Sequence, residues 1–310
     1  MKKRYLFAAD VGGTTIECGL FSTDGELLNS KTLITSEVIL SDVAECLAEE
    51  MKKRMSEQGI TIEEVYGIGL GVPGLVDSET GMVLKAPSLK WNRYPLGEKL
   101  HQLLGIPVFV GNDVNTGLLG EVEKGSLQHV KHALYFMIGT SIGSGLLMNG
   151  EIYPGSQFSA GEVGYMITDH NVLEDGFVPA RPGYGYLSTQ AGGFGLAVKY
   201  EKETGKSVTT KQLFKLAETG DQTARKIIDH ALRHLTASFI NAAVILNPEV
   251  ILLGGGVGNE LAPYLHQIDE NLEKYLPVKP ELRISTMQNR SVLYGAYALC
   301  SKHVKDQLNR

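Results

Sequence analysis

Cysteine is scarce in this chain of 310 residues, and the three that occur exclude several classes of protein. Cys18, Cys46 and Cys300 are far apart and odd in number, which argues against a disulfide framework and indicates a reduced, cytoplasmic protein. No apolar stretch approaches the length of a membrane span, so we expect no membrane association. The apolar run behind the basic N-terminus ends at Asp10 and is too short for a signal peptide.

Basic residues are also outnumbered, since 29 lysines and arginines face 35 acidic residues and the formal net charge is −6. A surface without excess positive charge argues against nucleic acid as a partner. Hydrophobic residues make up 43% of the chain, which together with its length predicts a soluble globular protein of two domains that share a cleft.

Two stretches rich in glycine and threonine are the most informative feature that is present. Residues 10–15 and 139–145 each lie between two apolar runs that are typical of strands. Such a strand–turn–strand connection exposes successive backbone N–H groups that can bind phosphate. We expect the two turns to bind a polyphosphate from both sides. The residues that carry this prediction are Asp10, Gly12, Gly13, Thr14 and Thr15 in the first turn, and Gly139 and Thr140 in the second.

The two halves of the chain show a similar order of predicted elements. Apolar runs predict strands over 5–10, 16–21, 27–34, 65–71 and 108–110, and again over 133–138, 145–148 and 250–253. Helical patterns cover 41–57, 96–104, 221–246 and 293–305, with another helix from about residue 260, whereas the glycine-rich residues 155–193 predict mainly loop. The similarity predicts an α/β protein with a duplicated, strand-rich core.

A carboxylate at the end of a predicted strand is the candidate general base. Asp113 follows the strand 108–110, and the C-terminal ends of strands line the usual crevice of an α/β sheet. There it can accept the proton of a substrate hydroxyl that attacks a phosphoryl group. The alternative interpretation is an aspartate that caps a helix over 114–124.

A second carboxylate, Asp10, directly precedes the first turn. A negative charge there would repel phosphate unless a divalent cation lies between them, so we expect Mg²⁺ near Asp10, held partly through water. The alternative is a turn cap. Glu162, flanked by glycines, is a candidate ligand of sugar hydroxyls, with a solvated loop charge as the alternative.

Three consecutive glycines, Gly254, Gly255 and Gly256, follow the predicted strand 250–253 and open a helix. A flat ring can lie against a backbone without side chains, and the start of a helix favours phosphate. The alternative is a close crossing of helix and strand.

Two other patterns are weaker. Residues 69–74 formally match the dinucleotide-binding fingerprint, but Pro73 and the turn-like sequence after it do not open a helix. His230 and His234 share a helix face but lack the glutamate and the further ligands of a zinc site. A P-loop is absent from the sequence.

Taken together, these motifs resemble the ROK family of bacterial glucokinases, N-acetylmannosamine kinases and related sugar kinases over nearly the whole chain. Residues 10–15 and 138–145 are similar to its two phosphate motifs, residues 112–121 to its catalytic segment and residues 254–256 to its adenosine loop. Residues 161–165 resemble its Gly-Glu-x-Gly-His signature. Residues 71–74 and 86–89 resemble its sugar-facing segment, which includes Gly74 and Ser88.

The resemblance implies an actin-like, hexokinase-type ATPase fold of the ribonuclease H-like class. A smaller N-terminal lobe would cover residues 1–117, completed by the C-terminal helix 293–310, and a larger lobe residues 118–292. It also implies Asp113 as the base, Asn112 and Glu162 as sugar contacts, ATP and Mg²⁺ as cofactors, and a homodimer, which is common in the family.

The chain departs from the family pattern at two sugar contacts and at the zinc segment. Tyr165 stands where the family has histidine, and Ser188 where it has a second sugar-binding glutamate. No cysteine lies between Cys46 and Cys300, so we expect no zinc site. Tyr165 can still donate a hydroxyl, and Ser188 leaves room for a substituted sugar near C1 and C2.

These departures leave the substrate open among glucose, N-acetylmannosamine, another hexose and a β-glucoside. Two other functions stay as alternatives. One is a sugar-sensing repressor. Such a protein needs a DNA-binding segment before the first phosphate turn, whereas only nine residues precede Asp10 here. The other is a sugar-binding regulatory protein without kinase activity.

Overall fold

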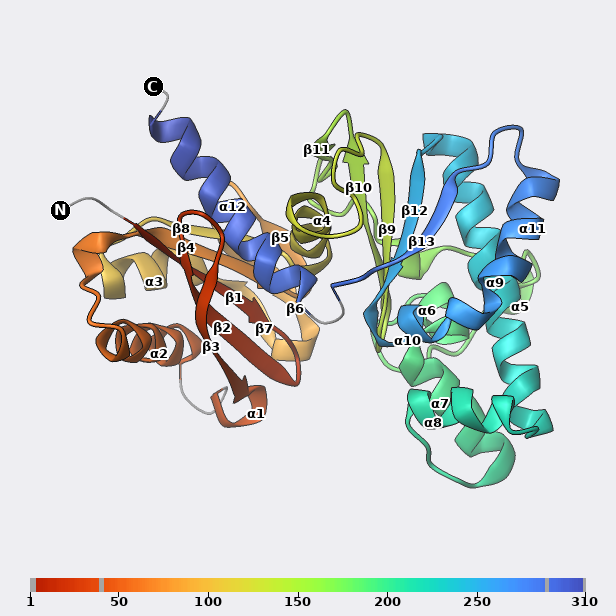
Figure 1. Cartoon of the computed structure of the whole chain (residues 1–310). Coiled ribbons are helices and arrows are strands. Elements are labelled where there is room, and N and C mark those ends of the chain that lie inside the picture. The colour runs from red at the N-terminus through yellow and green to blue at the C-terminus, as the bar shows by residue number, and fades with distance from the viewer. Residues whose placement is uncertain (1–3, 39–41, 288–289, 309–310) are drawn as a thin grey trace. The chain divides into compact units, whose positions relative to one another are not determined.

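The computed structural model describes residues 4–38, 42–287 and 290–308, and Figure 1 shows the course of the chain through them. The chain divides into two compact units. The first consists of Met1–Gln128, Pro154–Ser159 and Arg290–Arg310, and the second of His129–Tyr153 and Ala160–Asn289. The lobe boundary expected at residues 117/118 therefore falls inside a helix, α4 (Asp113–Glu123), of the first unit.

The first unit is built on a five-stranded sheet of order β3-β2-β1-β4-β8. β1, β2 and β3 pair antiparallel, whereas β1, β4 and β8 pair parallel. A small antiparallel sheet of β5, β6 and β7 accompanies it. The strands are β1 (Tyr5–Val11), β2 (Thr15–Ser22), β3 (Leu27–Ile34), β4 (Val65–Val72), β5 (Leu75–Asp77), β6 (Met82–Ala86), β7 (Trp91–Tyr94) and β8 (Val108–Asn112). The helices are α1 (Thr35–Val38), α2 (Val43–Glu57), α3 (Leu96–Leu104), α4 and α12 (Ser291–Leu308).

The second unit repeats this plan with a five-stranded sheet of order β11-β10-β9-β12-β13. Its first three strands pair antiparallel, and β9, β12 and β13 pair parallel. The duplicated core is thus present as a shared strand order. The strands are β9 (Ala133–Ile138), β10 (Ile142–Met148), β11 (Glu151–Ile152), β12 (Val250–Gly254) and β13 (Glu281–Ile284). The helices are α5 (Val172–Asp175), α6 (Tyr186–Ala191), α7 (Gly193–Thr204), α8 (Thr210–Glu218), α9 (Gln222–Leu246), α10 (Gly255–Glu260) and α11 (Leu265–Tyr275).

Several local predictions match these bounds, and others do not. The α9 helix begins after Asp221, whose Oδ1 accepts a hydrogen bond from Ala224 N at 2.9 Å, as a helix cap should. Residues 155–193, expected to be mainly loop, contain α5 and α6 and the first residue of α7. The helix expected from about residue 260 corresponds to α11. A further helix, α10, precedes it and starts within the three consecutive glycines, at Gly255. Residue 41 of the helix expected over 41–57, and residues 309–310 of the C-terminal helix, lie outside the described residues.

Alternation along β1 builds two cores, one on each face of the first sheet. Phe7, Ala9 and Val11 face a cluster that includes residues of α2 and α3. Leu6 and Ala8 face α12 in a second cluster. In the second unit, one large cluster joins β9 and β12 to α9, where the rings of Phe136 and Phe239 meet edge to face at 4.7 Å.

A row of glycines in β4 lets α12 lie directly on the sheet. Added Cβ atoms at Gly67, Gly69 and Gly71 would lie 3.2 Å from Cys300 Sγ, 1.8 Å from Ala296 O and 2.4 Å from Val292 Cγ1. These α12 positions are four residues apart, which is one face of a helix. Two glycines of the formal dinucleotide fingerprint, Gly69 and Gly71, therefore serve helix packing, whereas Gly74 lies against β6.

None of the helices in the described part of the chain combines the length and the apolarity that a membrane crossing requires.

We expect Gly69→Ala to destabilise the protein by about 2–4 kcal/mol, because the added methyl would overlap the Ala296 carbonyl and force α12 away from β4. Denaturant unfolding measures the change. Lys31→Ala, which removes an exposed side chain from β3 of the same sheet, is the control and should change stability by less than about 0.5 kcal/mol. Equal stability of Gly69→Ala and the wild type would contradict the close packing.

Candidate functional site

The first phosphate turn connects β1 to β2 and is exposed to solvent at Gly13, Thr14 and Thr15. Gly12 N donates to Thr15 O at 2.9 Å and closes the turn. The N–H groups of Gly13 and Thr14 donate to no backbone acceptor within residues 4–38, 42–287 and 290–308. Two adjacent, exposed donors are therefore available to an anion.

A buried threonine that sequence reasoning missed supports this turn from behind. Thr35 Oγ1 donates to Gly12 O at 2.8 Å, and Thr35 N donates to Thr14 O at 2.9 Å. Both carbonyls are thus turned away from the exposed side. Nothing in the local sequence identifies Thr35, because it lies 20 residues after the turn and reaches it through the pairing of β2 with β3.

The ends of three parallel strands bring the other candidates of the first unit together. Asp10 in β1 lies opposite Gly71 in β4, and Val72 in β4 lies opposite Asn112 in β8. Asn112 Nδ2 donates to Gly74 O at 2.8 Å. The predicted residues at this edge therefore form one cluster.

Ser88 lies beside the first turn as well, although it is far from it in sequence. A Cβ atom on Gly13 would lie 3.2 Å from Ser88 Cβ. The side chain of Ser88 is exposed. The sugar-facing segment of the resemblance and the first phosphate turn are thus neighbours within this unit.

Asn112, and not Asp113, caps the helix that follows. Asn112 Oδ1 accepts from Asn115 N at 3.1 Å, and Asp113 is the first residue of α4. Asp113 Oδ1 accepts from Val114 N at 2.9 Å and from Asn112 Nδ2 at 3.1 Å. Both bonds end on the same oxygen and hold the carboxylate in a fixed orientation.

Burial makes Asp10 and Asp113 weaker acids than a free aspartate. Burial and, to a smaller extent, the charges of Asp113 and Glu17 raise the pKa of Asp10 to about 7. Burial also raises the pKa of Asp113 to about 6, against the opposing effect of its hydrogen bonds. A carboxyl group with such a pKa is suited to proton transfer near neutral pH.

The second phosphate turn connects β9 to β10 and has the same plan as the first. Gly139 N donates to Ser141 O at 2.9 Å, whereas Thr140 N and Ser141 N donate to no backbone acceptor in the described part of the chain. The residues that carry these two N–H groups are exposed. The N-terminal end of α7 holds the turn, since Gly193 N donates to Gly139 O at 2.8 Å and Phe194 N to Thr140 O at 3.1 Å.

The three glycines after β12 lie beside this second turn but have different roles. A Cβ atom on Gly254 would lie 2.5 Å from Tyr135 Oη, and one on Gly255, where φ is +80°, would lie 2.6 Å from Ile138 O. These two positions need glycine for close packing against β9. Gly256 is exposed, and a Cβ atom added to it would meet no described atom within 4 Å outside its own helix, so this position borders open space.

The remaining candidates lie on the segment after β11 and on α6. Glu162 is exposed and precedes a 3₁₀ turn over Val163–Tyr165. Tyr165 is 58% exposed, and its hydroxyl donates to Gly183 O at 2.7 Å. Ser188 is buried, and its Oγ accepts from Ile142 N at 3.1 Å. The hydroxyls of Tyr165 and Ser188 are thus both bonded within the unit.

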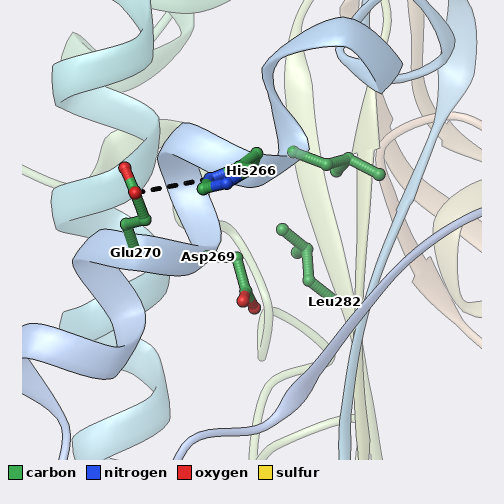
Figure 2. Close-up of a pocket in the computed structure, with 5 residues that line it drawn as sticks. His266, Asp269, Glu270 and Leu282 are labelled. Carbon is green, nitrogen blue, oxygen red and sulfur yellow. Dashed lines mark ion pairs between the residues drawn. The ribbon is translucent and has the colours of Figure 1, made fainter.

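A pocket of about 310 Å³ between α11 and β13 contains none of the predicted site residues. Figure 2 shows His266 pointing to Glu270, with His266 Nδ1 3.5 Å from Glu270 Oε1, and Asp269 and Leu282 beside them. His266 and Glu270 are largely exposed, and Asp269 is paired with Lys279 at 2.7 Å. This surface carries no catalytic constellation. Across the described residues, no three histidine, cysteine, aspartate or glutamate side chains gather into a group that could hold a metal ion.

Comparison with known proteins gives the family. The ROK family model matches residues 6–303. The chain belongs to the ROK family. A glucokinase from Halalkalibacterium halodurans is 32% identical over 321 residues, covering 95% of this chain and 94% of that protein. A β-glucoside kinase from Listeria innocua is 28% identical over 293 residues, covering 93% of this chain and 95% of that protein.

A solved structure, the ROK hexokinase from Thermus thermophilus, is similar with a TM-score of 0.78 and 27% identity, covering 97% of this chain and 99% of that one. The fold is the actin-like ATPase fold of such hexokinases, as the resemblance implied.

We expect Asp10→Asn to stabilise the protein at pH 8 by about 1–3 kcal/mol in buffer without nucleotide or metal. The raised pKa means that the folded protein resists ionisation of Asp10. The stability that neutral Asp10 contributes is fully present below its ordinary pKa of 3.8. This contribution is lost as the pH rises through the folded-state pKa of about 7. The amide of Asp10→Asn does not ionise and avoids this loss of stability, so the variant's advantage over the wild type should vanish at pH 4. Denaturant unfolding at both pH values measures it.

Asp77→Asn is the matched control in the same unit. Hydrogen bonds from Thr80 lower the pKa of Asp77, so its amide variant should be destabilised at pH 8. A loss of stability for Asp10→Asn at pH 8 would contradict the electrostatic interpretation of Asp10.

Proposed function

We propose that this protein is a sugar kinase that transfers the γ-phosphoryl group of ATP to a primary hydroxyl of a hexose or hexose derivative, as a glucokinase does. The observation that carries the proposal is that each unit exposes a turn with two N–H groups that donate to no backbone acceptor among the described residues, and that the first unit also holds the half-buried carboxylate of Asp113. Phosphoryl transfer requires positioning, stabilisation of charge and one base, and these groups supply them. The names of the relatives, a glucokinase and a β-glucoside kinase, support the same class of reaction.

Each candidate residue has a role in the proposed reaction. Gly12–Thr15 and Gly139–Thr140 bind the phosphates of ATP through backbone N–H groups, and Gly254–Gly256 provide the surface for the adenosine, with Gly256 open to it. Asn112, Glu162 and the neighbouring Gly74 and Ser88 orient the sugar. Asp113 accepts the proton of the sugar hydroxyl while the oxygen of that hydroxyl forms a bond to the γ-phosphorus. The bond between the γ-phosphorus and the bridging oxygen breaks, and ADP leaves.

The carboxylate of Asp10 fits a divalent cation. It is half-buried, it lies near Asp113 and Glu17, and the charges of both contribute to its raised pKa, so a cation would relieve the repulsion. Mg²⁺ held by Asp10, in part through water, would neutralise phosphate charge during transfer.

The identity of the sugar, the homodimer and the cytoplasmic location stay predictions. Glucose is the first choice, and N-acetylmannosamine and β-glucosides are the others. A sugar-binding regulatory protein without kinase activity is the second candidate function, favoured by one observation: the hydroxyls of Tyr165 and Ser188 are bonded within the chain. A coupled assay of ADP release over monosaccharides and glycosides decides between them, since a regulator would bind a sugar without turnover.

We expect Asp113→Asn to lower kcat about 10²–10⁴-fold, because the amide cannot accept the proton. The fold should persist, since the amide oxygen can still accept from Val114 N. Steady-state kinetics with the best sugar of the panel measures the effect. Glu123→Gln, the same chemical change at an exposed position of the same helix, should leave kcat unchanged. Full turnover by Asp113→Asn would refute the assignment of the base.

The rate should also depend on pH in a defined direction. Asp113 must be ionised to accept a proton, and its pKa is about 6. We therefore expect kcat/KM to fall roughly tenfold per pH unit below about pH 6. A pH–rate profile measures this, and the residual activity of Asp113→Asn should lack the acid limb. A profile that is flat down to pH 4.5 would exclude Asp113 as the base.

A further inference from the structure

Ser188 occupies a position where its hydroxyl contacts the second phosphate turn. Its side chain is 3% exposed, and Oγ accepts the N–H of Ile142 at 3.1 Å. Ile142 is the first residue of β10 and directly follows the exposed turn 139–141. The hydrogen bond therefore fixes the point at which the turn enters its strand.

The same turn is held at its other side by the helix that follows Ser188. Gly192 N donates to Ser188 O at 3.0 Å, which closes α6, and the next two N–H groups bind the carbonyls of Gly139 and Thr140. The segment from Ser188 to Phe194 thus binds the turn at Gly139 and Thr140 and its exit at Ile142. With its carbonyls and its exit fixed, the turn directs the N–H groups of Thr140 and Ser141 toward solvent.

The hydroxyl of Ser188 is covered by a neighbouring segment of the chain. An added Cβ atom on Gly164 would lie 2.4 Å from Ser188 Oγ and 2.5 Å from Ile142 O. The backbone of the 3₁₀ turn after Glu162 therefore covers the hydroxyl. Glu162, by contrast, is exposed.

We infer that Ser188 is a positioning residue for the second phosphate turn and acts on the nucleotide through Ile142, instead of contacting the sugar. This inference rests on the proposed kinase function, because it assumes that the turn binds ATP. Loss of the hydroxyl would leave the Ile142 N–H without its acceptor and allow the turn to shift.

Kinetics of Ser188→Ala test the inference. We expect the KM for MgATP to rise roughly three- to tenfold, the range that corresponds to one lost hydrogen bond, while the KM for the sugar stays at its wild-type value. The Kd of a non-hydrolysable ATP analogue, measured by calorimetry without sugar, should rise by the same factor. A rise in the sugar KM alone would overturn the inference and make Ser188 a sugar contact.

Thr189→Val is the matched control, because Thr189 is the next residue of α6 and its buried Oγ1 accepts Ala180 N at 3.1 Å. Both variants remove a buried acceptor from the same helix, but only Ser188 contacts the turn. Both should unfold at lower temperature, and only Ser188→Ala should bind the nucleotide more weakly. Equal nucleotide affinities in the two variants would mean that Ser188 contributes only to stability, and would overturn the inference.

The failure of the proposed function itself would look different. In that case the wild-type protein would release no ADP with any sugar of the panel and would not bind the nucleotide analogue. A wild-type protein that binds and turns over ATP, together with an unchanged nucleotide affinity in Ser188→Ala, would refute only the inference about Ser188.

Discussion

The register of three parallel strands is the constraint from which the rest of the first unit follows. It places the ends of β1, β4 and β8 at one edge, with Asp10 opposite Gly71 and Asn112 opposite Val72. Glycines at 71 and 111 then allow α12 and α4 to approach, since a Cβ atom on Gly111 would lie 2.7 Å from Thr116 Oγ1. Asp10 and Asp113 lie near each other at this edge, and desolvation there raises the pKa of both carboxyl groups.

The duplication is one of topology and hydrogen bonding more than of sequence. Both five-stranded sheets have the same strand order. In each, a glycine N–H closes the phosphate turn, and the next two N–H groups donate to no backbone acceptor within the described ranges. The supports of the two turns nevertheless differ. A single threonine, Thr35, supports the first turn, whereas Ser188 and the start of α7 support the second. A backbone arrangement can therefore be kept while the side chains behind it change.

Much of the fold was predictable from the sequence because local patterns determine it. The apolar runs gave the strands on either side of both turns, and Asp221 gave the start of α9. The sequence also named Asp10 and Asp113, since a carboxylate after a buried strand lies at the edge of the sheet. It could not assign roles to glycines or hydroxyls, because these depend on contacts between distant segments. Gly69 packs on α12, Gly255 on β9, and Ser188 on β10, each from far along the chain.

The way in which α12 closes the first unit affects how the protein is made. The helix packs on the glycine row of β4, more than 200 positions away, and an added Cβ on its Gly295 would lie 1.6 Å from Thr116 O in α4. A growing chain leaves the ribosome from its N-terminus, so β1, β4 and α4 emerge long before the helix that covers them. The second unit, encoded between them, can fold while that apolar sheet face is still bare. During synthesis, this face of the early strands therefore stays without its native cover until the last helix has been made.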